Sequence, residues 1–187
     1  KFTFADTVTA ATVISGDSTL TFAAQKNIVG AVTNDSGAAA GTLAFSATAG
    51  TTIVANAALG ATTAAEYLKA VNITVNDAND TDTSQATLSG AVFATTVTAD
   101  ASASHDTVLF SGNVSATTLN LDGAGVFTLN GTNTATTVIS GDSITTVGAA
   151  GKFVGAVTND GTTGEGTLTF AAHTANETLI KSSSTIG

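Results

Sequence analysis

The fold of this chain is indicated by the motif Ser89-Gly90-Ala91-Val92-Phe93-Ala94-Thr95-Thr96-Val97. It returns 22 residues later as Ser111-Gly112-Asn113-Val114-Ser115-Ala116-Thr117-Thr118-Leu119. After 19 more residues it returns as Asn130-Gly131-Thr132-Asn133-Thr134-Ala135-Thr136-Thr137-Val138, and an earlier form without the glycine is Asp6-Thr7-Val8-Thr9-Ala10-Ala11-Thr12-Val13. Such spacing is typical of one coil of a β-solenoid, in which each coil packs only on its neighbours. We therefore predict an all-β fold, a right-handed parallel β-helix with coils of 19–22 residues. An array of β-sandwiches, in which the same spacing would mark pairs of strands, is the alternative.

The paired threonines of this motif predict where each coil bends. Val92 and Ala94 share one face of a strand, and strict alternation would then place the next apolar residue outside. A bend between Thr95 and Thr96 returns Val97 to the core. The same argument predicts buried positions for Leu119, Val138 and Val13.

A much longer repeat contains these coils. Residues 12–18 (TVISGDS) recur at 137–143 and residues 30–35 (GAVTND) recur at 155–160, so the shift is 125 residues. Between Phe2 and Phe45, 25 of 44 positions are identical at this shift without a gap. We predict a continuous solenoid in which residues 1–125 form a first repeat and residues 126–187 begin an incomplete second one. The chain is therefore expected to be a fragment of a longer repeat protein.

The composition favours a folded β protein. Hydrophobic residues make up 43% of the chain and charged residues 10%, whereas disorder normally combines low hydrophobicity with high net charge. Thr and Val favour strands because branching at Cβ suits a pleated surface. Strand signals outside the motif lie at residues 2–4, 18–22, 28–32, 42–45 and 51–54. Residues 61–70 have helical character and are expected to form a short helix or a turn on a loop.

The charge balance excludes some partners. The net charge is −9, so a nucleic acid is not expected to bind, because that affinity rests on neutralising phosphates with Lys and Arg. The chain has no cysteine and therefore neither disulfides nor thiolate metal sites. No apolar run approaches the roughly 18 residues of a membrane helix, so this segment is not expected to insert into a membrane.

One acidic segment is the only local candidate for a metal site. Asp77, Asn79, Asp80 and Asp82 could offer hard oxygen ligands to Ca²⁺, which takes six to eight of them. The glycine and glutamate of an EF-hand loop are not in register, and a solvated acidic loop is the competing interpretation. No other cofactor is expected.

The sequence contains little that points to catalysis. His105 and His173 are the only histidines and show no partner pattern. The Ser-Gly-Asp-Ser stretches that begin at Ser15 and Ser140 are predicted to be turns, since catalytic residues are not usually duplicated in a repeat. With one Tyr and five basic residues, the chain is not expected to be an enzyme, and a β-helical carbohydrate-active enzyme is kept as an alternative.

The order of motifs resembles the passenger region of large bacterial autotransporters, particularly surface antigens of the rickettsial outer-membrane type. The resembling stretches are residues 28–35 (IVGAVTND), 41–45 (GTLAF), 58–60 (ALG), 67–73 (YLKAVNI) and the Gly-x-Val-x-Ala-Thr-Thr coils. The resemblance implies a β-helical passenger that is exported through a C-terminal barrel and displayed on the bacterial surface, where it adheres or forms a protective coat. Its partner would be a ligand on a host or neighbouring cell, or copies of itself. A self-assembling filament or S-layer subunit is the alternative function.

Overall fold

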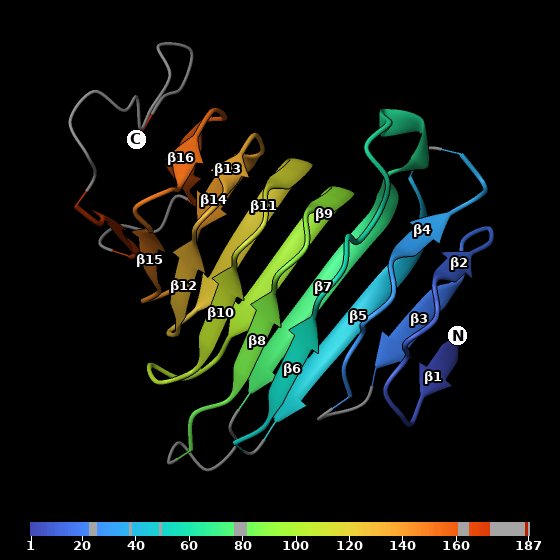
Figure 1. Cartoon of the computed structure of the whole chain (residues 1–187). Coiled ribbons are helices and arrows are strands. Elements are labelled where there is room, and N and C mark those ends of the chain that lie inside the picture. Colours follow the sequence, from blue (N-terminus) through green and yellow to red (C-terminus); the bar gives the residue numbers. More distant parts are fainter. Residues whose placement is uncertain are drawn as a thin grey trace.

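The chain folds into a solenoid of parallel β-strands, with the N-terminus at one end and later coils stacked toward the other (Figure 1). The computed structural model describes residues 1–22, 26–37, 39–48, 50–76, 82–160, 165–172 and residue 186. Every strand pairing among these residues is parallel. This confirms the predicted β-solenoid, because a sandwich would join antiparallel strands by hairpins.

The strands form two sheets and one short pair. The larger sheet contains β1 (Phe2–Phe4), β3 (Thr19–Phe22), β5 (Ala40–Thr48), β7 (Leu68–Asn76), β9 (Val92–Ala101), β11 (Val114–Gly123), β13 (Thr132–Asn133), β14 (Thr136–Ile139), β16 (Lys152–Phe153) and β17 (Val157–Asn159). The second contains β6 (Thr52–Ala55), β8 (Gln85–Leu88), β10 (Thr107–Phe110), β12 (Val126–Leu129), β15 (Ile144–Val147) and β18 (Thr167–Phe170). The pair is β2 (Thr12–Ile14) with β4 (Val32–Asn34).

Residues that stack from coil to coil define three faces. Face 1 contains Thr12, Val32, Leu59, Val92, Val114, Asn133 and Phe153. Face 2 contains Leu20, Leu43, Val71, Val97, Leu119, Thr137 and Val157. Face 3 contains Val8, Ile28, Ala55, Leu88, Phe110, Leu129, Val147 and Phe170.

The length of a coil varies more than the motif predicts. Successive members of face 3 are 20, 27, 33, 22, 19, 18 and 23 residues apart, which makes seven coils between Val8 and Phe170. The predicted length of 19–22 residues is therefore wrong for the longer coils. The longest one carries a 3₁₀ turn at Ala64–Glu66 and residues 77–81, which lie outside the described part.

The threonine corner is confirmed where the motif is complete. In β9 the residues Val92, Ala94 and Val97 are buried, whereas Thr95 and Thr96 between them are both partly exposed. The strand pairing with β11 also skips Thr95. Two consecutive outward residues mark the bend, and Val97 and Leu119 return to the core as predicted.

The prediction is wrong for Val138 and Val13. Asn133 pairs with Val114 but Thr137 pairs with Leu119, so this corner is one residue shorter than the one before it. Thr137 therefore takes the core position, and Val138 is only half-buried. Val13 lies between Thr12 and Ile14, which are both less exposed than Val13. Its own side chain points outward and is 56% exposed.

The glycines of the motif stack directly on one another. A Cβ atom on Gly131 would collide with the carbonyl of Gly112, and one on Gly112 would collide with the carbonyl of Gly90. The backbones of successive coils thus approach too closely at this corner for any side chain. This contact explains why glycine returns with the coil.

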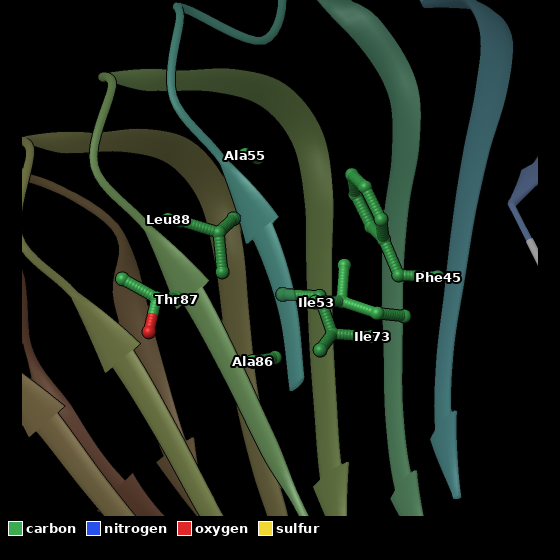
Figure 2. A pocket seen from close by; sticks show the side chains of 7 residues that line it. All are labelled: Phe45, Ile53, Ala55, Ile73, Ala86, Thr87 and Leu88. Carbon is green, nitrogen blue, oxygen red and sulfur yellow. The ribbon is translucent and has the colours of Figure 1, made fainter. Parts of the chain in front are cut away.

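The interior is a packed apolar core. Ile53 and Leu88 from the second sheet face Phe45 and Ile73 from the larger one (Figure 2), and the space between them is too small for a water molecule. Phenylalanines also stack along the axis. The ring of Phe22 lies 5.3 Å from that of Phe4 and 5.8 Å from that of Phe45. Such a core, continuous through all coils, holds the solenoid rigid.

The two copies of the long repeat keep the same local pairing but lie on different faces. Thr12 pairs with Val32, and their counterparts Thr137 and Val157 pair identically. Yet Thr12 belongs to face 1 and Thr137 to face 2. The shift of 125 residues therefore corresponds to a whole number of coils plus one face. Equivalent residues of the two copies lie on neighbouring faces.

One local prediction is wrong. Residues 28–32 do not form a strand, because Ile28 makes an isolated bridge and β4 begins only at Val32. Residues 61–70 contain the short 3₁₀ turn, in agreement with the expected short helix or turn, and Leu68 already starts β7. Within the described residues, no helix has the length and apolar character needed to cross a membrane.

Candidate interaction face

The predicted calcium segment is mostly outside the described residues. Asp77, Asn79 and Asp80 fall in the gap at 77–81, and only Asp82 is described, as an exposed residue beside Gly50. The described part of the chain contains no group of three or more His, Cys, Asp or Glu side chains placed to hold a metal ion. Calcium binding at Asp82 and its neighbours stays a prediction.

The histidines do not define a site in the described structure. His105 is half-buried in the turn that precedes β10, and His173 lies outside the described residues. No described contact therefore joins the two histidines, and the expectation that neither is catalytic stays a prediction.

Both Ser-Gly-Asp-Ser stretches are turns, as predicted. Gly16 and Gly141 adopt the same positive φ of 62°, which favours glycine. Ser15 donates a hydrogen bond to Asp35 Oδ2 at 2.9 Å, and its counterpart Ser140 donates to Asp122 Oδ1 at 2.9 Å. In each copy, the serine ties the turn to a carboxylate of an adjacent coil.

Asp35 accepts a second hydrogen bond from the Ser36 hydroxyl at 2.9 Å. The bonds from Ser36 and Ser15 stabilise the charged carboxylate and hold the pKa of Asp35 below its ordinary value. The group is exposed, and its partners belong to the two turns themselves. We therefore interpret it as a clamp between coils.

A buried acid that the sequence pattern did not reveal lies in the turn between β9 and β10. Asp106 is fully buried, and its carboxylate accepts hydrogen bonds from the backbone N–H groups of Ser84 and Ala103 at 3.1 and 3.3 Å. Ser102 contributes a longer one at 3.5 Å. Because these donors satisfy the buried side-chain oxygens locally, we interpret Asp106 as a structural residue.

The outer surface of the larger sheet carries a regular array of short polar side chains. Outward positions of β7, β9 and β11 stack in register, one coil above the next, about 4.8 Å apart. We call this surface the polar face; its residues are Asn72, Thr74, Thr96, Thr98, Asp100, Thr118, Asn120 and Asp122.

The side chains of the polar face interact along the axis. Asn120 Nδ2 donates to Thr98 Oγ1 at 3.5 Å. Asp100 stacks on Asp122, and burial together with the charge of Asp122 raises the pKa of the Asp100 carboxyl. The face thus presents amides, hydroxyls and carboxylates at fixed spacing on a rigid core. Sequence analysis missed it, although the alternation of Val71-Asn72-Ile73-Thr74-Val75 signalled an outward polar side.

No family model, no curated protein and no solved structure matches this chain. The autotransporter resemblance therefore stays a prediction.

Proposed function

We propose that this chain is a non-catalytic structural and adhesive segment of a bacterial cell-surface or secreted repeat protein. The polar face is the observation that supports the proposal, because three neighbouring coils present hydrogen-bonding groups stacked in register. Its partner would be a ligand on a host or neighbouring cell. The low content of Lys and Arg, five residues in all, argues for recognition by hydrogen bonds rather than by positive charge.

The rigidity of the core supports the same role. An adhesive surface gains affinity when its groups are already held in the binding arrangement, since little conformational freedom is then lost. The buried residues Val97, Ala99 and Ala101 anchor the backbone of β9, which holds the backbone positions of Thr98 and Asp100 between them. A stalk function would use the same stacking of coils.

A binding assay with matched variants tests this proposal. The fluorescently labelled chain is incubated with cultured epithelial cells and with bacterial cells, and bound label is measured by flow cytometry. In the test variant, Asn72→Arg and Asn120→Arg place two bulky cations on the polar face. In the control variant, Thr87→Arg and Thr128→Arg add the same charge on the outward side of β8 and β12.

We expect at least a tenfold loss of cell binding in the polar-face variant and little change in the control. Circular dichroism of both variants must match the parent chain. Equal binding of the two variants, or no saturable binding of the parent chain to either cell type, would overturn the proposal.

A further inference from the structure

A short modification motif recurs along the chain. Asn-x-Ser/Thr, in which x is not Pro, is the acceptor motif for N-linked sugars, and it occurs six times. Two of these motifs, which begin at Asn79 and Asn176, lie outside the described residues. The other four begin at Asn34, Asn72, Asn113 and Asn130. A sugar joined to asparagine is bulky and hydrated, so the fold decides which of these four residues has room for one.

Three of the four asparagines are held by contacts within or between coils. Asn34 is 5% exposed, and its side-chain nitrogen, the atom that would carry the sugar, donates to a backbone carbonyl at 2.7 Å. The amide oxygen of Asn113 accepts a hydrogen bond from the backbone N–H of Thr132, one coil later, at 2.9 Å. Asn130 is half-buried. A sugar would break the bond of Asn34 and would stand against the neighbouring coil at the other two positions.

Asn72 has a different environment. It is exposed at an outward position of β7, and within the described residues no hydrogen bond engages its amide. Its partners in the two adjacent strands are Ala44 and Thr98, and Ala70 precedes it on the same side of β7. Two of these three neighbours end at Cβ, so the surface around the Asn72 amide is low enough to leave room for a pyranose ring.

The hydroxyl of the motif lies on the same side of the strand. Asn72 and Thr74 are both exposed, whereas Ile73 between them is 1% exposed. The alternation of an extended strand thus directs the amide and the hydroxyl to solvent together. A sugar on Asn72 would therefore point away from the core and would leave the packing of Ile73 unchanged.

We propose that Asn72 is an acceptor for an N-linked sugar. The side-chain nitrogen of Asn72 attacks the anomeric carbon of a hexose that is activated on a nucleoside diphosphate. A C–N bond forms, the bond from the anomeric carbon to the phosphate oxygen breaks, the nucleoside diphosphate leaves, and a base of the transferase takes the amide proton. Since β7 is paired with β5 and β9, transfer takes place on the chain before this sheet forms. The proposal does not depend on the adhesive role.

The test produces the full chain in bacterial cells together with a transferase that joins glucose from UDP-glucose to Asn-x-Ser/Thr motifs. Folded chain is isolated by size-exclusion chromatography, and peptide mapping by mass spectrometry measures the sugar at each motif. We expect a hexose at Asn72 in at least half of the folded molecules, and at least tenfold lower occupancy at Asn34. Equal occupancy at Asn34 and Asn72 would overturn the proposal, because burial would then not select the site.

Two substitutions of the exposed Thr74 form a matched pair. Thr74→Ala removes the motif and should abolish the sugar at Asn72, whereas Thr74→Ser keeps the motif and should retain the sugar. Circular dichroism of both variants must match the parent chain. No sugar at Asn72 in the parent chain, or undiminished sugar in the Thr74→Ala variant, would also overturn the proposal. Cell binding by the polar face is measured on chain without sugar, so the two proposals fail separately.

Discussion

The carboxylate of Asp106 accepts a hydrogen bond from the backbone N–H of Ser84, one coil earlier, at 3.1 Å. Both residues are completely buried. The second oxygen of Asp106 accepts a bond from Ala103 within its own turn. One side chain thus closes a turn and joins it to its neighbour, in a solenoid where most other contacts between coils are backbone pairs and apolar packing.

Replacing this carboxylate should destabilise the protein strongly. Asp106→Ala leaves the N–H groups of Ser84 and Ala103 buried without an acceptor, so we expect a loss of about 3 kcal/mol in the free energy of unfolding. Urea denaturation followed by circular dichroism measures it. Asp142→Ala, at an exposed turn position, is the control and should change stability by less than about 0.5 kcal/mol. Equal effects of the two changes would contradict the structural role of Asp106.

Ionisation of Asp100 should oppose folding. Its pKa in the folded chain is raised by burial and by the charge of Asp122, so the destabilisation is fully present above the raised pKa. It disappears as the pH falls below the ordinary value of 3.8. We therefore expect Asp100→Asn to raise the melting temperature at pH 7 by about 1–3 °C and to have little effect at pH 3. A gain of the same size at both pH values would show that the charge is not its cause.

The contribution of each phenylalanine to the free energy of unfolding should follow the burial of its side chain. Phe22 is completely buried between Phe4 and Phe45, so Phe22→Ala should cost about 3–5 kcal/mol of unfolding free energy. Phe2 is 64% exposed, and Phe2→Ala should cost less than about 1 kcal/mol. Chemical denaturation of both variants measures the difference. Equal costs for the two substitutions would contradict this dependence on burial.

Two buried threonines should respond oppositely to the same substitution. Thr145 packs between Phe127 and Leu168, and within the described residues its hydroxyl has no hydrogen-bond partner. Thr145→Val should therefore raise the free energy of unfolding by about 1 kcal/mol, since it removes a buried unsatisfied group. Thr137 accepts a bond from Asn133 Nδ2 at 2.6 Å. Thr137→Val should lower stability by about 1–2 kcal/mol because the amide loses its acceptor.

Thermal denaturation of the two single variants and of the double mutant measures whether their stability changes have opposite signs. If both substitutions stabilise the protein, the hydrogen bond between Asn133 and Thr137 does not contribute. If both destabilise it, the hydroxyl of Thr145 has a partner in solution.

The solenoid could be predicted from the order of residues alone. Gly90, Gly112 and Gly131 recur because successive coils approach too closely there for a side chain. The threonine pairs after Ala94 and Ala116 recur because a bend there needs two consecutive outward residues. These are local requirements repeated in several coils, so they remain visible in the order of residues.

The register of each coil on the next could not be predicted in this way, because it depends on contacts between coils. The corner before Thr137 is one residue shorter than the corner before Leu119, and nothing near Val138 signals this. The polar face and the buried Asp106 depend in the same way on which residues lie one coil apart. A shift of one residue exchanges the inner and outer sides of a strand, and the choice is made by packing against the neighbouring coil.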